Sequence, residues 1–106
     1  MYTIKVLGGV MTILKVSSSS SPNMVAGAIA GAVRESGYAE LHAVGAGATN
    51  QAVKAIAIAS SFFREEGKML LCQPDFIEVK IGDVDRTAIR LRVRSVPLEE
   101  EPVATE

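Results

Sequence analysis

Two kinds of hydrophobic pattern divide the chain into expected strands and helices. Stretches rich in β-branched residues, or with apolar and polar residues in alternation, predict strands at 12–17, 39–44, 69–81 and 85–95. Two stretches of small apolar residues predict helices at 22–36 and 49–66. From residue 11 onward the expected order is therefore β-α-β-α-β-β.

This order predicts an α+β fold in two layers. The first two strands are expected to be parallel, because a right-handed helical crossover joins them. The last two strands are expected to form an antiparallel hairpin. We therefore predict a four-stranded mixed sheet with two helices on one face, and with both strand-to-helix loops at the same end.

Particular residues mark the ends and contacts of the first helix. Ser21 is expected to cap it, with Pro22 at its first position, where the missing N–H group costs nothing. Gly37 is expected to end it in the left-handed conformation. Gly27 and Gly31 lie four residues apart, which predicts close packing against a neighbouring backbone.

Apolar matching predicts a register for the last two strands. Their apolar residues face each other only if paired positions sum to an even number, as with Val79 opposite Ile89. The connecting loop then has an odd number of residues, such as 83–85. The same register sets Glu78 opposite Arg90 as a cross-strand ion pair.

Charge and composition separate a central domain from the two ends of the chain. With 106 residues, the chain is expected to form one domain, at 11–96. Residues 1–10 are expected to be an N-terminal extension, either poorly ordered or an extra edge strand. Residues 97–106 hold four of the 12 acidic side chains and none of the 11 basic ones, which predicts an acidic disordered tail. Residues 1–96 therefore carry a net charge of +3, a modest value for binding nucleic acid.

Composition also bears on location. There is no run of about 18 apolar residues, as a membrane helix would need, and no pattern of a secretory signal at the N-terminus. The single cysteine, Cys72, cannot form an internal disulfide and is expected to be a small core residue. We therefore expect a cytoplasmic protein that does not enter a membrane.

The two strand-to-helix loops are candidate sites for an anion, because unpaired N–H groups at a helix start can hold phosphate or carboxylate. In the first loop, residues 17–21 are serines that could donate hydroxyl groups, although a flexible polar loop is an equally good interpretation. Gly45-Ala46-Gly47 would allow close approach of a ligand. Asn50 and Gln51 could contact that ligand, or Asn50 could only cap the second helix.

Arg90, Arg92 and Arg94 form the most concentrated basic feature of the sequence. On a strand they share one face at intervals of about 6.8 Å, near the spacing of phosphates along a nucleic-acid strand. With Lys80 and Arg86 they could contact phosphate groups. The alternative is the solvated face of a half-buried strand, where charges are expected.

Few residues point to catalysis. His42 is the only histidine, and it shares strand parity with Glu40 on a face that we expect to be at the surface. No Ser/His/acid arrangement and no metal-ligand spacing is visible in the sequence. We therefore expect no enzyme, no metal and no cofactor.

Four strings of residues resemble a known family. They are Ile-Leu-Lys-Val-Ser at 13–17, Ser-Pro-Asn-x-Val-Ala-Gly-Ala-Ile-Ala-Gly at 21–31, Ala-Val-Gly-Ala-Gly-Ala-x-Asn-Gln-Ala-Val-Lys-Ala at 43–55 and Arg-Thr-Ala-Ile at 86–89. In order and spacing they resemble the stage V sporulation protein S family, over about residues 11–95. That family is similar in layout to Alba, a small chromatin protein with the order β-α-β-α-β-β.

The resemblance implies a protein that binds DNA or RNA as a dimer. Alba-like proteins bind through the first strand-to-helix loop, the region before the second helix and the arm of the last two strands. In this chain those regions, with Lys80, hold the candidate residues Ser18, Ser19, Ser20, Ser21, Asn23, Gly45, Gly47, Asn50, Gln51, Lys80, Arg86, Arg90, Arg92 and Arg94. Alba has lysines in its first loop where this chain has only serines. Weak binding is therefore expected, because cations set the salt-dependent part of the affinity.

Three functions remain open at this point. The first is a nucleic-acid-binding regulatory protein. The second is a protein-interaction or scaffold module that self-associates as a two-fold dimer, or as a tetramer formed by two such dimers, through an apolar sheet face and the alanine-rich helix surface. The third is a small-anion sensor that uses the two helix N-termini.

Overall fold

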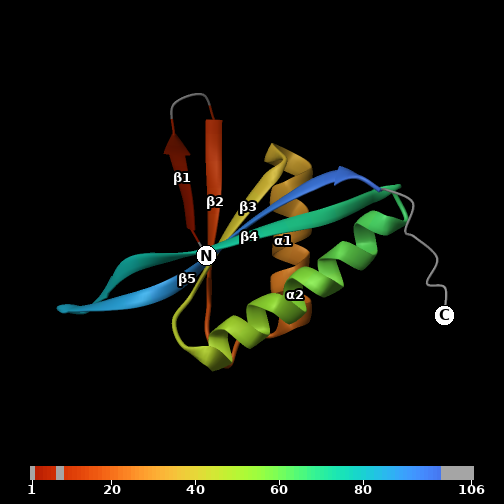
Figure 1. Cartoon of the computed structure of the whole chain (residues 1–106). Coiled ribbons are helices and arrows are strands. Elements are labelled where there is room, and N and C mark those ends of the chain that lie inside the picture. Colours follow the sequence, from red (N-terminus) through yellow and green to blue (C-terminus); the bar gives the residue numbers. More distant parts are fainter. Residues whose placement is uncertain (1, 7–8, 99–106) are drawn as a thin grey trace.

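The computed structural model of the chain describes residues 2–6 and 9–98, which form strands and helices in one α+β domain (Figure 1). The strands are β1 (Tyr2–Val6), β2 (Gly9–Val16), β3 (Tyr38–Ala43), β4 (Lys68–Ile81) and β5 (Val84–Pro97). The helices are α1 (Pro22–Ser36) and α2 (Ala46–Arg64). From β2 onward the order is β-α-β-α-β-β, as the sequence predicts.

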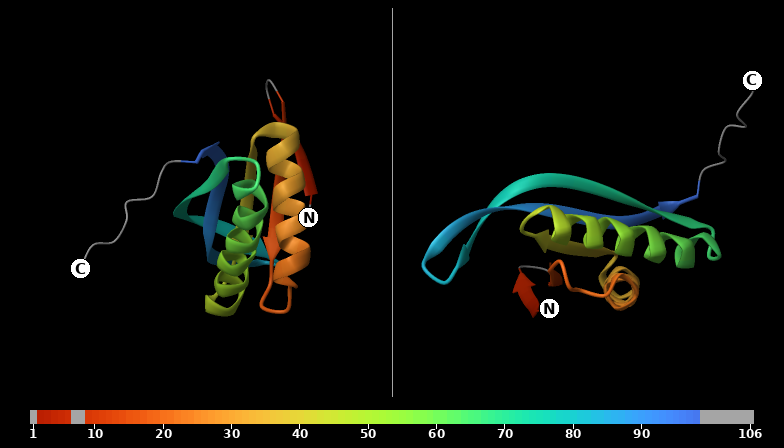
Figure 2. Two further views of the ribbon diagram at one scale, coloured as in Figure 1. Left: turned by 90° about the vertical axis from the view of Figure 1, so that its right-hand side faces the viewer. Right: turned by 90° about the horizontal axis from the view of Figure 1, so that it is seen from below.

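The strands form one sheet in the order β1-β2-β3-β5-β4. β2 and β3 are parallel, and every other pair of neighbours is antiparallel. Strands β2 to β5 are the predicted four-stranded mixed sheet, and β1 adds a strand at the edge beside β2. Both helices lie on the same face of the sheet (Figure 2). The predicted α+β class is therefore confirmed. Of the predicted acidic tail, residues 99–106 lie outside the described residues, and Pro97 ends β5.

Local chemistry sets the helix boundaries. The Ser21 hydroxyl accepts a hydrogen bond from the Met24 N–H at 3.4 Å, and Gly37 ends α1 with φ 81°, both as predicted. α2 begins at Ala46 rather than at the predicted residue 49. Gly45 adopts φ 89° directly after β3, so the chain turns into the helix earlier than the sequence indicated.

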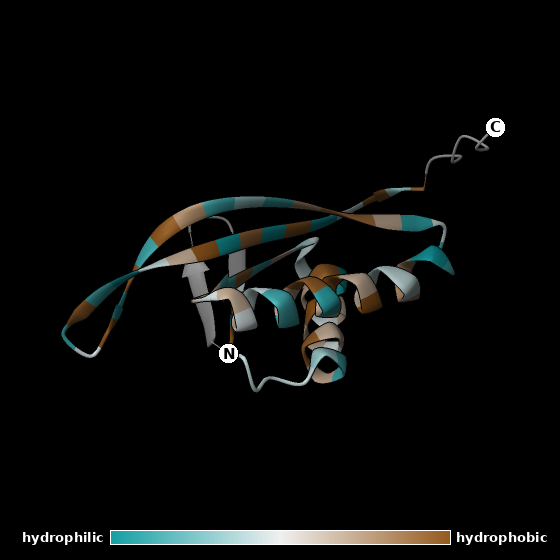
Figure 3. Cartoon of the chain, turned by 60° about the horizontal axis from the view of Figure 1, so that its bottom comes forward, coloured by the Kyte–Doolittle hydropathy of each residue, from teal (hydrophilic) through white to brown (hydrophobic). Residues whose placement is uncertain are grey.

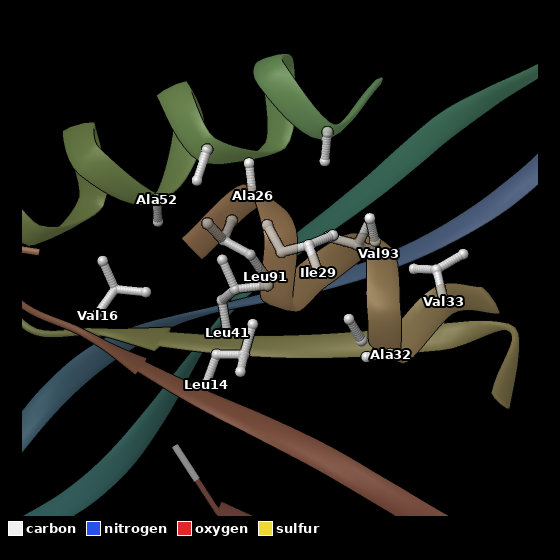
Figure 4. Packing of buried hydrophobic residues seen from close by; sticks show 14 of the residues in the cluster. Leu14, Val16, Ala26, Ile29, Ala32, Val33, Leu41, Ala52, Leu91 and Val93 are labelled. Carbon is white, nitrogen blue, oxygen red and sulfur yellow. The ribbon is translucent and has the colours of Figure 1, made fainter. Parts of the chain in front are cut away.

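The core consists of small and branched side chains between the helices and the sheet (Figure 4). Four residues on one face of α2 are at most 3% exposed: Ala48, Ala52, Ala55 and Ala59. The predicted close contact at Gly27 and Gly31 is wrong, because nothing lies within 4 Å of a Cβ built at either position. Cys72 is exposed on the outer strand β4 and is not a core residue.

The β4–β5 hairpin has a shorter turn than the sequence analysis predicts. Ile81 pairs with Val84, so the turn has the two residues Gly82-Asp83, and Gly82 has φ 60°. A positive φ at the first central residue is typical of the two-residue type II′ hairpin turn. Val79 is therefore not opposite Ile89, and the predicted three-residue loop is wrong.

The corrected register places an arginine opposite an apolar residue. Val79 lies opposite Arg86. Glu78 lies opposite Thr87, whose hydroxyl donates a hydrogen bond to the carboxylate at 3.0 Å. The predicted ion pair between Glu78 and Arg90 does not form. Near the turn, the face that holds Val79 and Arg86 is otherwise apolar, and the face that holds Glu78 and Thr87 is polar.

The end of the hairpin projects beyond the helices as an arm (Figures 1 and 2). We define the arm as residues 77–88, because β5 gains β3 as a second neighbour only from Ile89 onward. Hydrophilic and hydrophobic residues are interspersed along it (Figure 3). Ile81 and Val84, beside the turn, are 52% and 59% exposed.

Candidate nucleic-acid interface

The two strand-to-helix loops meet at one end of the sheet. A Cβ at Gly47 would lie 3.0 Å from the Cβ of Ser18, closer than ordinary van der Waals contact. The Gln51 side-chain amide donates a hydrogen bond to the Ser20 carbonyl at 2.9 Å. The fold therefore brings together two of the three regions predicted from the resemblance. Gln51 serves as a link between them.

Within the first loop the serines hydrogen-bond mainly to one another. The Ser17 N–H donates to Ser20 Oγ at 2.9 Å, and Ser17 Oγ lies 3.1 Å from Ser19 Oγ. Ser21 is used as the helix cap. The Ser18 hydroxyl makes no hydrogen bond with the part of the chain that the structure describes, and the residue is exposed. Ser18 is therefore the serine best placed to contact a ligand.

Asn23 and Asn50 lie in the first turns of α1 and α2, and both are exposed. Gly45 precedes the first turn of α2 as its N-cap and contributes no side-chain hydrogen bond. These predicted residues therefore surround the meeting point of the two loops, and the two asparagine side chains are accessible to solvent there.

On the face of the sheet opposite the helices, which we call the open face, side chains align in rows across the strands. Lys15, His42, Arg90 and Asp75 occupy matched positions on β2, β3, β5 and β4. Arg90 Nε and Nη2 donate to Asp75 Oδ1 and Oδ2 at 2.8 and 2.5 Å. This hydrogen bonding lowers the pKa of the Asp75 carboxyl. Arg90, predicted to contact phosphate, therefore already has an anionic partner.

Glu40 and His42 are not surface residues, contrary to the sequence interpretation. Glu40 is 5% exposed, since β3 lies inside the sheet. Its Oε1 accepts a hydrogen bond from the Tyr38 hydroxyl at 2.8 Å, and its Oε2 lies 2.6 Å from His42 Nε2. Burial alone would raise the pKa of Glu40, but the hydrogen bonds from His42 and Tyr38 lower it below its usual value. The centre of the open face is therefore a buried polar cluster.

The other predicted cations differ in their partners. Arg92 Nε is buried, lies 3.9 Å from a Glu40 oxygen and has no hydrogen-bond partner among the described residues. Lys80 forms a loose ion pair within the hairpin at 3.8 Å. Arg86 and Arg94 are exposed and form no ion pair within residues 2–6 and 9–98. Arg86 and Arg94 are therefore the predicted arginines most accessible to an anion.

A groove of about 620 Å³ lies between the first loop and the arm. Its lining comes from residues 15–18, from His42 and Val44, and from residues 77–81 of β4. Lys15 and Lys80 are the basic residues of this lining, and Glu78 is its acidic residue. Along β4, Glu78 and Lys80 alternate with Ile77, Val79 and Ile81, so the two sets of side chains leave opposite faces of the strand. The groove thus joins the first loop to the arm, two regions that the resemblance had named separately.

The sequence analysis did not identify Asp75, Glu40 and Tyr38 as partners in this region. Asp75 pairs with Arg90, Glu40 lies beside Arg92, and Tyr38 donates a hydrogen bond to Glu40. The Gly82-Asp83 dipeptide is typical of a two-residue hairpin turn, and it would have given the observed register. That register sets Asp75 opposite Arg90. The burial of Glu40 had no comparable local signal, because it depends on the strands on both sides of β3.

Two further features bear on the class of protein. Within the described ranges, no helix is long and apolar enough to cross a membrane. The same part of the chain contains no group of three or more His, Cys, Asp or Glu residues that could hold a metal ion.

Comparison with protein families gives a match to the family model described as stage V sporulation protein S, over residues 12–96. The matched region runs from β2 to the last residues of β5 and includes both helices. The resemblance seen in the sequence over nearly the same range is thereby confirmed. The chain belongs to the stage V sporulation protein S family, and so to a group of sporulation-related regulatory proteins.

Proposed function

We propose that this chain is a non-catalytic regulatory protein that binds a strand of DNA or RNA in the groove between its first loop and its arm. The observation that carries the proposal is the shared lining of the groove by residues 15–18 and 77–81. These segments belong to two of the three regions through which Alba-like proteins bind nucleic acid. The third region, at the start of α2, is held against the first loop by the Gln51 hydrogen bond.

The groove offers the kinds of contact that a nucleic-acid strand requires. Lys15 and Lys80 provide positive charge for phosphates, and the Ser18 hydroxyl can donate to a phosphate oxygen. Ile77 and Val79 provide apolar surface for the sugars and bases. Arg86 lies directly opposite Val79 and adds an exposed cation to the arm.

The binding should be weak and sensitive to salt. Glu78 lies in the groove lining, and Lys80 is paired loosely with Asp85. Only a few cations can then replace the counterions of the nucleic acid. We expect dissociation constants of about 10⁻⁴–10⁻⁶ M, the range of non-specific binding.

A direct test is fluorescence anisotropy of labelled single-stranded DNA and RNA of random sequence, at about 50 mM salt. The proposal predicts saturable binding by the unmodified chain and weaker binding by the Lys80→Gln/Arg86→Gln double variant. A matched control is Arg34→Gln/Lys68→Gln, which removes the same charge from exposed positions outside the groove. Failure to bind either nucleic acid would reject the proposal.

We propose in addition that the chain self-associates, first as a two-fold dimer. The open face is polar at its centre, so it does not provide the apolar sheet face that the sequence suggested. Apolar surface remains elsewhere: Met24, Phe76 and Val53 are 78%, 75% and 54% exposed. Light scattering at micromolar concentration should give a mass above the 11.2 kDa of one chain. A mass equal to that of one chain would contradict this proposal.

A further inference from the structure

A second cavity, of about 500 Å³, lies on the open face over β3, β5 and β4. Its lining residues are Tyr38, Leu71, Cys72, Gln73, Arg92, Val93 and Arg94. Two of them are arginines, and none carries a carboxylate. The volume is in the range of sites for small organic ligands. The cavity is therefore large enough for a nucleotide and electropositive in its lining.

The register brings the polar groups of this cavity together. Arg92 lies directly opposite Gln73 on β4, and Arg94 lies directly opposite Tyr38 on β3 and Leu71 on β4. Directly opposed side chains on neighbouring strands have Cβ atoms about 4.5–5.5 Å apart. The two guanidinium groups and the Gln73 amide can therefore reach the same bound group.

The positive charge of the cavity is only partly balanced by its surroundings, because Glu40 lies 3.9 Å from Arg92 Nε. Both oxygens of Glu40, the nearest carboxylate to Arg92, already contact Tyr38 and His42. Arg92 Nε is buried without a hydrogen-bond partner in the described structure, which is unfavourable for a charged donor. Arg94 has no ion pair with any described residue. An anion in the cavity could pair with Arg94 and with the part of the Arg92 guanidinium group that is exposed.

We propose that this cavity binds the phosphate group of a nucleotide-sized ligand between Arg92 and Arg94. Guanidinium groups match phosphate oxygens with paired donors, and two of them suit a doubly charged phosphate better than a single carboxylate. The Tyr38 ring and the Leu71 side chain provide apolar walls for the rest of the ligand. The site goes beyond the proposed function, because it uses no residue of the groove. The phosphate could belong to a free nucleotide or to the end of a nucleic-acid strand.

Calorimetry with a nucleoside monophosphate and with the unphosphorylated nucleoside tests the site. The chain should bind the monophosphate and not the nucleoside. Arg94→Gln should weaken the binding about ten-fold or more, because a charge-assisted hydrogen bond is removed. Arg92→Lys should weaken it too, while the retained charge beside Glu40 preserves the fold. Lys54→Gln/Lys68→Gln, outside the cavity, should bind as the unmodified chain does.

A dinucleotide with and without a 5′-phosphate separates the two sources of the ligand. Tighter binding of the phosphorylated dinucleotide than of the monophosphate would support the site as one for strand ends. Equal binding would support it as one for free nucleotides. The proposal is overturned if the nucleoside binds as well as its monophosphate, or if Arg94→Gln and Arg92→Lys both bind unchanged. Loss of strand binding in Lys80→Gln/Arg86→Gln, with monophosphate binding kept, would show that the groove and the cavity are independent.

Discussion

Arg90 on β5 and Asp75 on β4 lie directly opposite each other and form a two-point salt bridge, with N–O distances of 2.8 and 2.5 Å. This pair divides the three arginines of β5 that share the open face. Arg90 is held by Asp75, Arg92 lies beside Glu40, and Arg94 is left without an ion pair among the described residues. The sequence of β5 predicted three equivalent phosphate contacts. In the structure, the end of β5 that carries Arg94 is the part most accessible to an anion.

Asp75→Asn should change how stability depends on pH. Arg90 lowers the pKa of Asp75 in the folded chain. The carboxylate therefore stabilises the fold above its unfolded pKa of about 4, and this contribution disappears as the pH falls through the lower, folded pKa. The variant should be less stable at neutral pH and lose less stability on acidification. Urea unfolding at several pH values measures this.

Asp85→Asn is the matched control for that experiment. Asp85 is exposed, and its pairing with Lys80 is loose, at 3.8 Å. Its pH profile should stay close to that of the unmodified chain. If Asp75→Asn also reproduces the unmodified profile, the salt bridge does not contribute to stability in solution.

Tyr38 should ionise only in strongly alkaline solution. Burial, together with its hydrogen bond to Glu40 and the charge of that carboxylate, raises the pKa of Tyr38 to about 12. An unfolded tyrosine ionises near pH 10, so stability should fall between about pH 10 and 12 as the unfolded state alone releases this proton. Absorbance titration measures the ionisation, and Tyr38→Phe identifies its signal. A normal tyrosine pKa at this position would be inconsistent with the buried cluster.

Glu40→Gln tests the same cluster from its centre. The amide keeps the size of the side chain but removes the charge beside Arg92 and alters the contact with His42. A decrease of about 1–3 kcal/mol in unfolding free energy is expected, as for a buried polar group deprived of its partner. The pKa of Tyr38 should also decrease in this variant. Unchanged stability and an unchanged Tyr38 titration would together contradict the arrangement.

Two glycine substitutions should have opposite effects on stability. Gly27 lies exposed in α1 with no neighbour within 4 Å of an added Cβ, so Gly27→Ala should stabilise the chain by about 0.5–1 kcal/mol. Gly47→Ala would place its Cβ 3.0 Å from that of Ser18, and should destabilise the chain by about 1 kcal/mol or more. Thermal unfolding compares the two. If Ser18→Gly restores the stability lost in Gly47→Ala, the close approach of these two residues caused the loss. If Gly47→Ala instead stabilises the chain, the two loops separate easily.

The parts of the fold that the sequence predicts correctly depend on neighbours close in the chain. Ser21 and Gly37 mark the ends of α1 through contacts within a few residues, and their sequence signals are reliable for that reason. The order of strands and helices likewise follows from periodicity within each element. The first loop and the start of α2 were predicted to share one end of the sheet, and Ser20 and Gln51 do meet there.

The parts that sequence reasoning did not predict have two causes: a local turn signal that was passed over, and contacts between distant segments. Matching Val79 with Ile89 assumed that one face of the hairpin is buried, but the arm extends beyond the core, and the turn sets its register instead. Glu40 looked like a surface residue by alternation alone. Its burial follows from the position of β3 between two other strands, which local sequence does not encode.

Asn50→Ala should separate the contribution of hydrogen bonding to oligonucleotide affinity from the contribution of charge. Asn50 is exposed in the first turn of α2. If it contacts the strand, Asn50→Ala should weaken oligonucleotide binding with little change in salt dependence, because a neutral amide releases no counterions. Anisotropy at two salt concentrations measures both quantities. A marked change in salt dependence would place Asn50 outside this role.

The salt dependence of oligonucleotide binding tests the central proposal most directly. For the unmodified chain, the logarithm of the affinity should fall linearly with the logarithm of the salt concentration. In Lys80→Gln/Arg86→Gln, the slope should become shallower by about 0.7 for each phosphate of a single strand that the variant no longer neutralises. Arg34→Gln/Lys68→Gln should keep the slope of the unmodified chain. Absence of binding at about 50 mM salt, or an identical slope and affinity in the arm variant, would contradict nucleic-acid binding in the groove.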